Sequence, residues 1–68
     1  MQVAVSSAMA LELVRTAEDY YYGQTGVGVS HRIRVTAMRK FIEDVRKRNP
    51  KATITLTLED HMFLSELP

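Results

Sequence analysis

Residues 52–58 of this chain, Ala-Thr-Ile-Thr-Leu-Thr-Leu, alternate strictly between an apolar residue and a threonine. A period of two places the apolar side chains on one face of a β-strand and the threonines on the other. The β-branched residues also favour an extended backbone. A lone strand leaves its backbone N–H and C=O groups unpaired, so this segment needs a neighbouring strand. The sequence therefore predicts a fold that contains a sheet.

Two other segments have the apolar spacing of amphipathic helices. Over residues 7–22 apolar side chains recur three and four residues apart. Ser6 or Ser7 offers an N-cap oxygen there, and Gly23 can take the left-handed conformation that ends a helix. A second helix is predicted from about residue 37 to residue 48, capped by Thr36 and ended by Asn49-Pro50. Its predicted inner face consists of Ala37, Met38, Phe41, Ile42 and Val45.

Residues 27–35 are ambiguous between strand and helix. Val27, Val29, His31, Ile33 and Val35 alternate with smaller or basic residues, a period of two that favours a strand with its arginines outward. A helix that begins near residue 30 is the alternative, since residues 33 and 37 are apolar and four apart. We take the strand as the prediction.

The remaining elements complete an α+β, or small α/β, arrangement. A short helix is predicted over residues 58–67, with Thr57 and Asp60 spaced as in a capping box, and residues 2–5 are a possible third strand. Strand 52–58 would pair with strand 27–35 or with its own copy in a second chain. If strands 27–35 and 52–58 run parallel, the helix between them forms a right-handed crossover. Residues 1–68 are expected to form a single compact domain.

The small size of the chain limits how it can be stabilised. At 68 residues a domain gains little surplus from its own core, and disulfides, a metal or another subunit usually supply the difference. The chain has no cysteine, and its two histidines, His31 and His61, have no helical ligand spacing. No metal and no cofactor are expected. A homodimer, or a domain completed by a partner, is expected instead.

Charge is segregated along the chain. Residues 31–51 hold eight Lys or Arg against two Asp or Glu, whereas both flanking segments are acidic. A one-signed patch attracts an oppositely charged partner whatever the net charge. We therefore predict a surface that contacts DNA or RNA phosphates. Its candidate nucleic-acid-binding residues are Arg32, Arg34, Arg39, Lys40, Arg46, Lys47, Arg48 and Lys51.

Simpler roles compete for the same cations. Lys and Arg in the last turn of a helix complement its macrodipole, and Arg39 with Glu43 is an ordinary i,i+4 pair. Two DNA-binding motifs also fit poorly. In a helix-turn-helix, the positions that need a small and an apolar residue hold Gln24 and Arg34. A ribbon-helix-helix would need a second long helix where the threonine-rich segment lies.

The sequence contains no catalytic pattern. The three acidic pairs, which begin at Glu18, Glu43 and Glu59, are each adjacent in sequence, so their carboxylates diverge on a helix. The apolar start of the chain lacks the basic flank of a signal peptide, and Glu12 interrupts it, so no membrane span is expected. We predict a small cytoplasmic, non-enzymatic regulatory protein that binds nucleic acid. The alternative is a protein-protein interaction module or inhibitor that docks through an apolar face or sheet edge.

Overall fold

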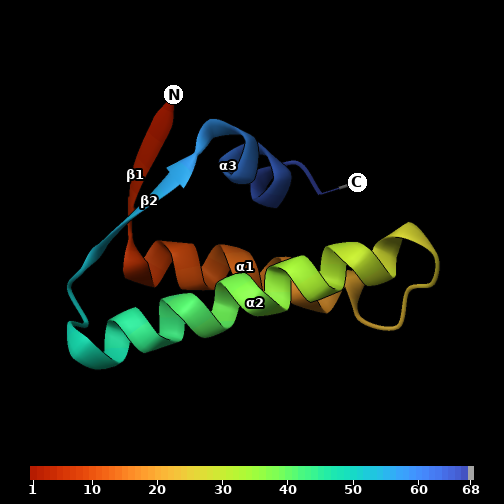
Figure 1. The fold of residues 1–68 in the computed structure, drawn as a ribbon, viewed down its shortest axis with the longest axis horizontal. Helices are drawn as coiled ribbons and strands as arrows, with labels where there is room; N and C mark the ends of the chain where they lie inside the picture. The colour runs from red at the N-terminus through yellow and green to blue at the C-terminus, as the bar shows by residue number, and fades with distance from the viewer. Residues whose placement is uncertain (68) are drawn as a thin grey trace.

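Two helices of unequal length form the body of the fold in the computed structural model, which describes residues 1–67. In chain order the elements are β1 (Gln2–Ser6), α1 (Ser7–Tyr21), α2 (Val27–Arg48), β2 (Thr53–Thr57) and α3 (Leu58–Ser65). α1 and α2 lie side by side and antiparallel, and the ribbon of β1 and β2 leads into α3 along one side of them (Figure 1). The predicted α+β class and the single compact domain are confirmed.

The threonine-rich segment forms a strand, as predicted, with Ile54 and Leu56 buried and its threonines exposed. Its partner is β1, the segment expected only as a possible third strand. The two strands run antiparallel, with Val3 opposite Leu56 and Val5 opposite Ile54. The predicted pairing with residues 27–35 is therefore wrong, and no crossover connects the two paired strands.

Residues 27–35 are helical, so the strand prediction for them is wrong. α2 runs without a break from Val27 to Arg48, and Thr36 lies inside it rather than capping it. The three buried residues of α2, Gly28, Val35 and Ile42, are spaced seven residues apart and lie on one face of the helix. That face packs on α1, and this long-range contact selects the helix over an extended conformation with the same alternating residues.

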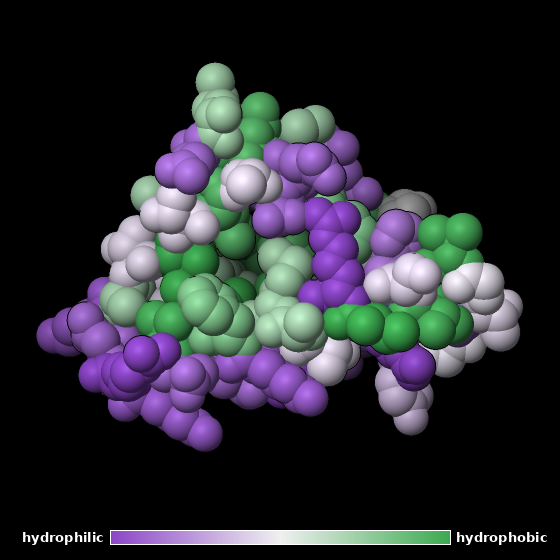
Figure 2. Space-filling view, in the orientation of Figure 1, coloured by the Kyte–Doolittle hydropathy of each residue, from purple (hydrophilic) through white to green (hydrophobic). Residues whose placement is uncertain are grey.

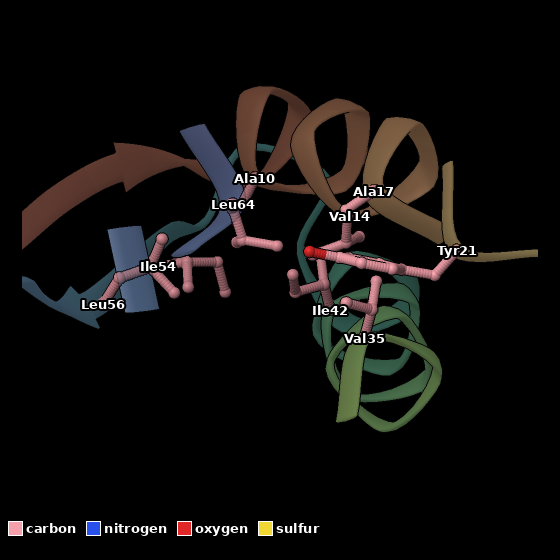
Figure 3. Packing of buried hydrophobic residues seen from close by; sticks show 9 residues of the cluster. All are labelled: Ala10, Val14, Ala17, Tyr21, Val35, Ile42, Ile54, Leu56 and Leu64. Carbon is pink, nitrogen blue, oxygen red and sulfur yellow. The ribbon is translucent and has the colours of Figure 1, made fainter. Parts of the chain in front are cut away.

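The core lies between the two helices and against the inner face of β2. From α1 it receives Ala10, Val14, Ala17 and Tyr21, and from α2 Val35 and Ile42. Ile54, Leu56 and Leu64 close it on the side of the ribbon and α3 (Figure 3). Because two of the four α1 residues are alanines, the helices can approach closely. None of the helices within residues 1–67 has the length and apolar character needed to cross a membrane.

The helix ends follow the sequence signals. The Ser6 hydroxyl accepts a hydrogen bond from the backbone N–H of Met9 at 3.1 Å and caps α1. After α1, Gly23 has a φ of 80°, the left-handed conformation predicted for it. The Thr57 hydroxyl accepts from the backbone N–H of Asp60 at 3.0 Å and caps α3. The predicted helix 58–67 is confirmed as a shorter helix that ends at Ser65.

Replacing Thr57 by alanine is expected to lower the free energy of unfolding by about 1 kcal/mol, because the first turn of α3 loses its cap. Urea denaturation followed by circular dichroism measures the change. Thr55→Ala is the matched control, since it removes an exposed threonine from the same strand without touching a helix end. Equal losses in the two variants would show that the cap contributes nothing.

Candidate interaction surfaces

An apolar groove lies between α2 and β2. Its volume is about 330 Å³, and its lining consists of Ala37, Met38, Phe41, Ile42, Ile54, Thr55, Leu56 and Asp60. The Phe41 side chain, on the α2 side of the groove, is 60% exposed. Figure 2 shows one broad face of the molecule, on which hydrophobic side chains gather around a central hollow between α2 and the segment β2–α3. An aromatic side chain beside an open apolar hollow is a typical feature of a protein-binding surface.

The same face carries an exposed apolar ridge along α2. Ile33, Ala37 and Phe41 follow one another at intervals of four residues, and we call these three residues the α2 ridge. All three are exposed, Ile33 to 63%. At 100° per residue Ile33 and Ala37 lie about 140–180° from the face of Val35 and Ile42 that packs on α1, and Phe41 lies about 100–120° from it, beside the groove. The prediction from the sequence that Ala37 and Phe41 lie on the inner face of this helix is wrong.

The structure places a second, wider hollow on the other flank of the ridge, between α2 and the end of α1. It has a volume of about 640 Å³ and shares Ala37 with the groove. Its remaining lining is Glu18, Asp19, Tyr22, Arg32, Ile33, Thr36 and Lys40. Tyr22 is 77% exposed here, whereas its neighbour Tyr21 is buried in the core. The α2 ridge therefore separates the groove, which has one charged lining residue, from a hollow that has four.

Three of the eight candidate nucleic-acid-binding residues form ion pairs within residues 1–67. Arg34 pairs with Asp60, and its guanidinium carbon lies 4.1 Å from the centre of the Phe63 ring. Arg39 donates to Glu18 at 2.8 Å and to Glu43 at 2.7 Å. Arg48 pairs with Asp44, one turn earlier, at 3.2 Å.

A fourth cation, Arg46, ties the end of α2 to the start of α1. Its Nη1 lies 3.0 Å from the Ser7 hydroxyl oxygen and 3.0 Å from the Pro50 carbonyl oxygen, and it donates to both. Ser7 is completely buried, and its backbone N–H donates to the Ala52 carbonyl oxygen at 2.8 Å. Arg46 therefore holds the loop between α2 and β2 in place.

The other four cations divide into two groups. Arg32 and Lys40 line the hollow between α1 and α2, next to Glu18 and Asp19. Lys47 and Lys51 are exposed near the end of α2, and within residues 1–67 neither forms an ion pair. In Figure 2 hydrophilic side chains gather at the lower left, over this end of α2. Arg32 and Arg34 do not share a face, because residues two apart on a helix point about 160° apart.

Glu18 is the most strongly bonded carboxylate that joins the two helices. It accepts from the Thr36 hydroxyl at 2.6 Å and from Arg39 Nε at 2.8 Å. The hydrogen bond from Thr36, followed by that from Arg39, holds the pKa of Glu18 below its ordinary value of 4.5, although partial burial opposes the shift. A lowered folded-state pKa means that the ionised carboxylate stabilises the fold above about pH 4.5. This stabilisation is lost as the pH falls through the folded-state pKa.

Glu18→Gln is expected to lower the free energy of unfolding by about 1–2 kcal/mol at neutral pH, because it weakens two hydrogen bonds to a charged group. The deficit should shrink as the pH is lowered below 4.5, where the wild-type carboxylate itself takes up a proton. Denaturation curves at several pH values measure this. Glu12→Gln, an exposed position on the same helix, is the control. A deficit that stays constant with pH would contradict the prediction.

The α2 ridge is the feature that sequence reasoning missed. Val29, Ile33, Ala37, Phe41 and Val45 form an uninterrupted apolar series at intervals of four residues. The predicted boundary at Thr36 divided the series between a strand and a helix, so it was not recognised. If residues 27–48 are taken as one helix, their sequence has two apolar faces, whereas packing on α1 requires only one.

No group of three His, Asp or Glu residues that could hold a metal ion lies within residues 1–67. Comparison of the chain with family models, with curated proteins and with solved structures finds no match. A functional proposal for this protein therefore has to rest on the geometry of residues 1–67. On that geometry the most distinctive surface is the α2 ridge with its groove.

Proposed function

We propose that this protein is a small cytoplasmic, non-enzymatic interaction module that docks on a protein partner through the α2 ridge and the adjoining groove. The observation that carries the proposal is Phe41, which stands 60% exposed at a groove lined by Ile42, Ile54 and Leu56. Exposed aromatic residues beside apolar pockets are the usual anchors of protein interfaces.

Burial of the α2 ridge by a partner would be favourable in free energy. Complete burial of a Phe or Ile side chain is worth about 1.5–3 kcal/mol. Because Phe41 and Ile33 leave roughly three fifths of their surface in water, a partner could recover about 1–2 kcal/mol from each. A surface of this shape suits a partner helix, whose apolar residues would pack beside the ridge and enter the groove.

Affinity capture from a nuclease-treated extract of the expressing cells tests the proposal. Wild-type bait is expected to retain a polypeptide, either another protein or an untagged copy of this chain, and Phe41→Glu to lose at least about nine tenths of it. Met9→Glu is the matched control, since Met9 is 55% exposed on α1. Retention that Phe41→Glu and Met9→Glu reduce equally would refute docking through the ridge.

A second candidate function is nucleic-acid binding at the end of α2. The observation that favours it is the group of Arg46, Lys47, Arg48 and Lys51, four cations in six residues, of which Lys47 and Lys51 have no ion-pair partner within residues 1–67. Each phosphate neutralised on duplex DNA should add about −0.9 to the slope of log affinity against log salt.

Replacing Lys47 and Lys51 together by alanine should make that slope shallower by roughly 1.8, as measured by fluorescence anisotropy with a labelled duplex. Lys40→Ala is the control, because Lys40 lies beside Glu18 in the hollow between the helices. Wild-type binding that is absent, or insensitive to salt, would exclude this second function.

A further inference from the structure

We infer that the partner of the α2 ridge is a second copy of this chain, which packs its own α2 antiparallel across the first, with a two-fold axis at Ala37. The inference rests on the proposed function and names the occupant of the same surface. Three features of the molecule support it: the shape of the ridge, the position and size of the face, and the small size of the chain.

The ridge is complementary to itself. A two-fold axis at Ala37 places residues equally far before and after it opposite each other, so Ile33 of one copy meets Phe41 of the other. Rows of side chains four residues apart interdigitate when two helices cross at about −50°, the commonest packing angle. The smallest of the three side chains, Ala37, lies at the crossing point, where the two backbones come closest.

The face that carries the ridge is broad enough for a stable interface. The molecule measures 35 × 26 × 14 Å, so its broad faces look along the short axis. In Figure 1 α2 lies in front of α1, and the face of α2 that is turned away from α1 is left open. A stable dimer buries about 800 Å² on each partner, about a sixth of the 4600 Å² of accessible surface of the molecule.

The size of the chain also favours a second copy. A domain of 68 residues without cysteine has no disulfide to supplement its core, and association is one of the remaining means of stabilisation. Symmetric pairing also covers the groove beside Phe41 in both copies. A symmetric contact of this kind would therefore bury the Ile33 and Phe41 side chains of both copies.

Cysteine cross-linking tests the arrangement against a clean background, because the natural chain has no cysteine. At a helix separation of about 9–10 Å the two Ala37 Cα atoms would lie about 4.4–5.4 Å apart, within disulfide range. Oxidation of Ala37→Cys should therefore give a linked dimer. Ile33→Cys and Phe41→Cys should link to each other when mixed and not when each is alone. Met9→Cys is the control.

The mass in solution gives the second readout. Sedimentation equilibrium over a concentration series should show a dimer for the wild type, with the dissociation constant raised at least about tenfold in Phe41→Glu. Met9→Glu should leave it unchanged. Circular dichroism spectra of both variants should match that of the wild type, which checks that they fold. A single dissociation constant for all three proteins would overturn the inference.

Other results separate this inference from the proposed function. A wild-type chain that is monomeric at all concentrations, yet still captures another protein through Phe41, would refute the dimer and leave the docking surface standing. A dimer that cross-links through Met9→Cys rather than Ala37→Cys would refute the arrangement across the ridge. Ile33→Cys that links efficiently to itself would refute the antiparallel direction.

Discussion

Replacing Ile42 by alanine is expected to give the largest loss of stability of any single substitution considered for this chain. Ile42 is 1% exposed and lies on the face of α2 that packs on α1. Isoleucine-to-alanine changes in protein cores lower the free energy of unfolding by about 2–5 kcal/mol, through lost burial and the cavity left behind. A chain of 68 residues has roughly 3–10 kcal/mol in total. One substitution would therefore remove between about a fifth and all of the stability.

A matched pair of valines on the same helix separates burial from residue type. Val35 is completely buried and Val27 is 71% exposed. Val35→Ala should lower the free energy of unfolding by about 2 kcal/mol, at about 0.8 kcal/mol for each methylene equivalent plus a cavity contribution. Val27→Ala should change it by less than about 0.5 kcal/mol. Similar losses at both positions would show that α2 is not oriented as described.

The second large effect is expected from enlarging Ala17. This residue is completely buried on the face of α1 that meets α2. Leucine at this position has no space unless the helices separate, and overpacking of this kind lowers the free energy of unfolding by about 1–3 kcal/mol. Thermal unfolding should show it as a fall in Tm of roughly 4–24 °C, at about 4–8 °C per kcal/mol for a domain of this size.

Ala8→Leu is the control for this experiment, because Ala8 is exposed on the same helix. Both variants add the same atoms and keep a good helix former, so only the site differs. A stable Ala17→Leu protein would mean that α1 and α2 are less tightly packed than the buried alanines indicate. If the dimer forms, the comparison should be made at one fixed protein concentration, because association raises the apparent stability.

Most of the local structure could be predicted from the sequence, because it depends on neighbours in the chain. The alternation around Ile54 and Leu56, the cap at Thr57 and the left-handed Gly23 are all as predicted. The eight candidate cations were identified by charge alone, which does not show where each side chain is bonded. Arg34 and Arg39 meet the carboxylates of Asp60 and Glu18, which lie 26 and 21 residues away.

The amino-acid sequence by itself determined α1, α3, the threonine-rich strand and the basic segment of residues 31–51. Periodicity, helix caps and charge act over a few residues, so they can be recognised without the fold. The tertiary structure decided that β1 pairs with β2, that residues 27–35 are helical, and that the α2 ridge faces outward. Residues 27–35 satisfy both a period of two and a helical repeat, so local preference is nearly balanced there. The balance is decided by burial of Val35 against α1, a contact that exists only when the chain has folded.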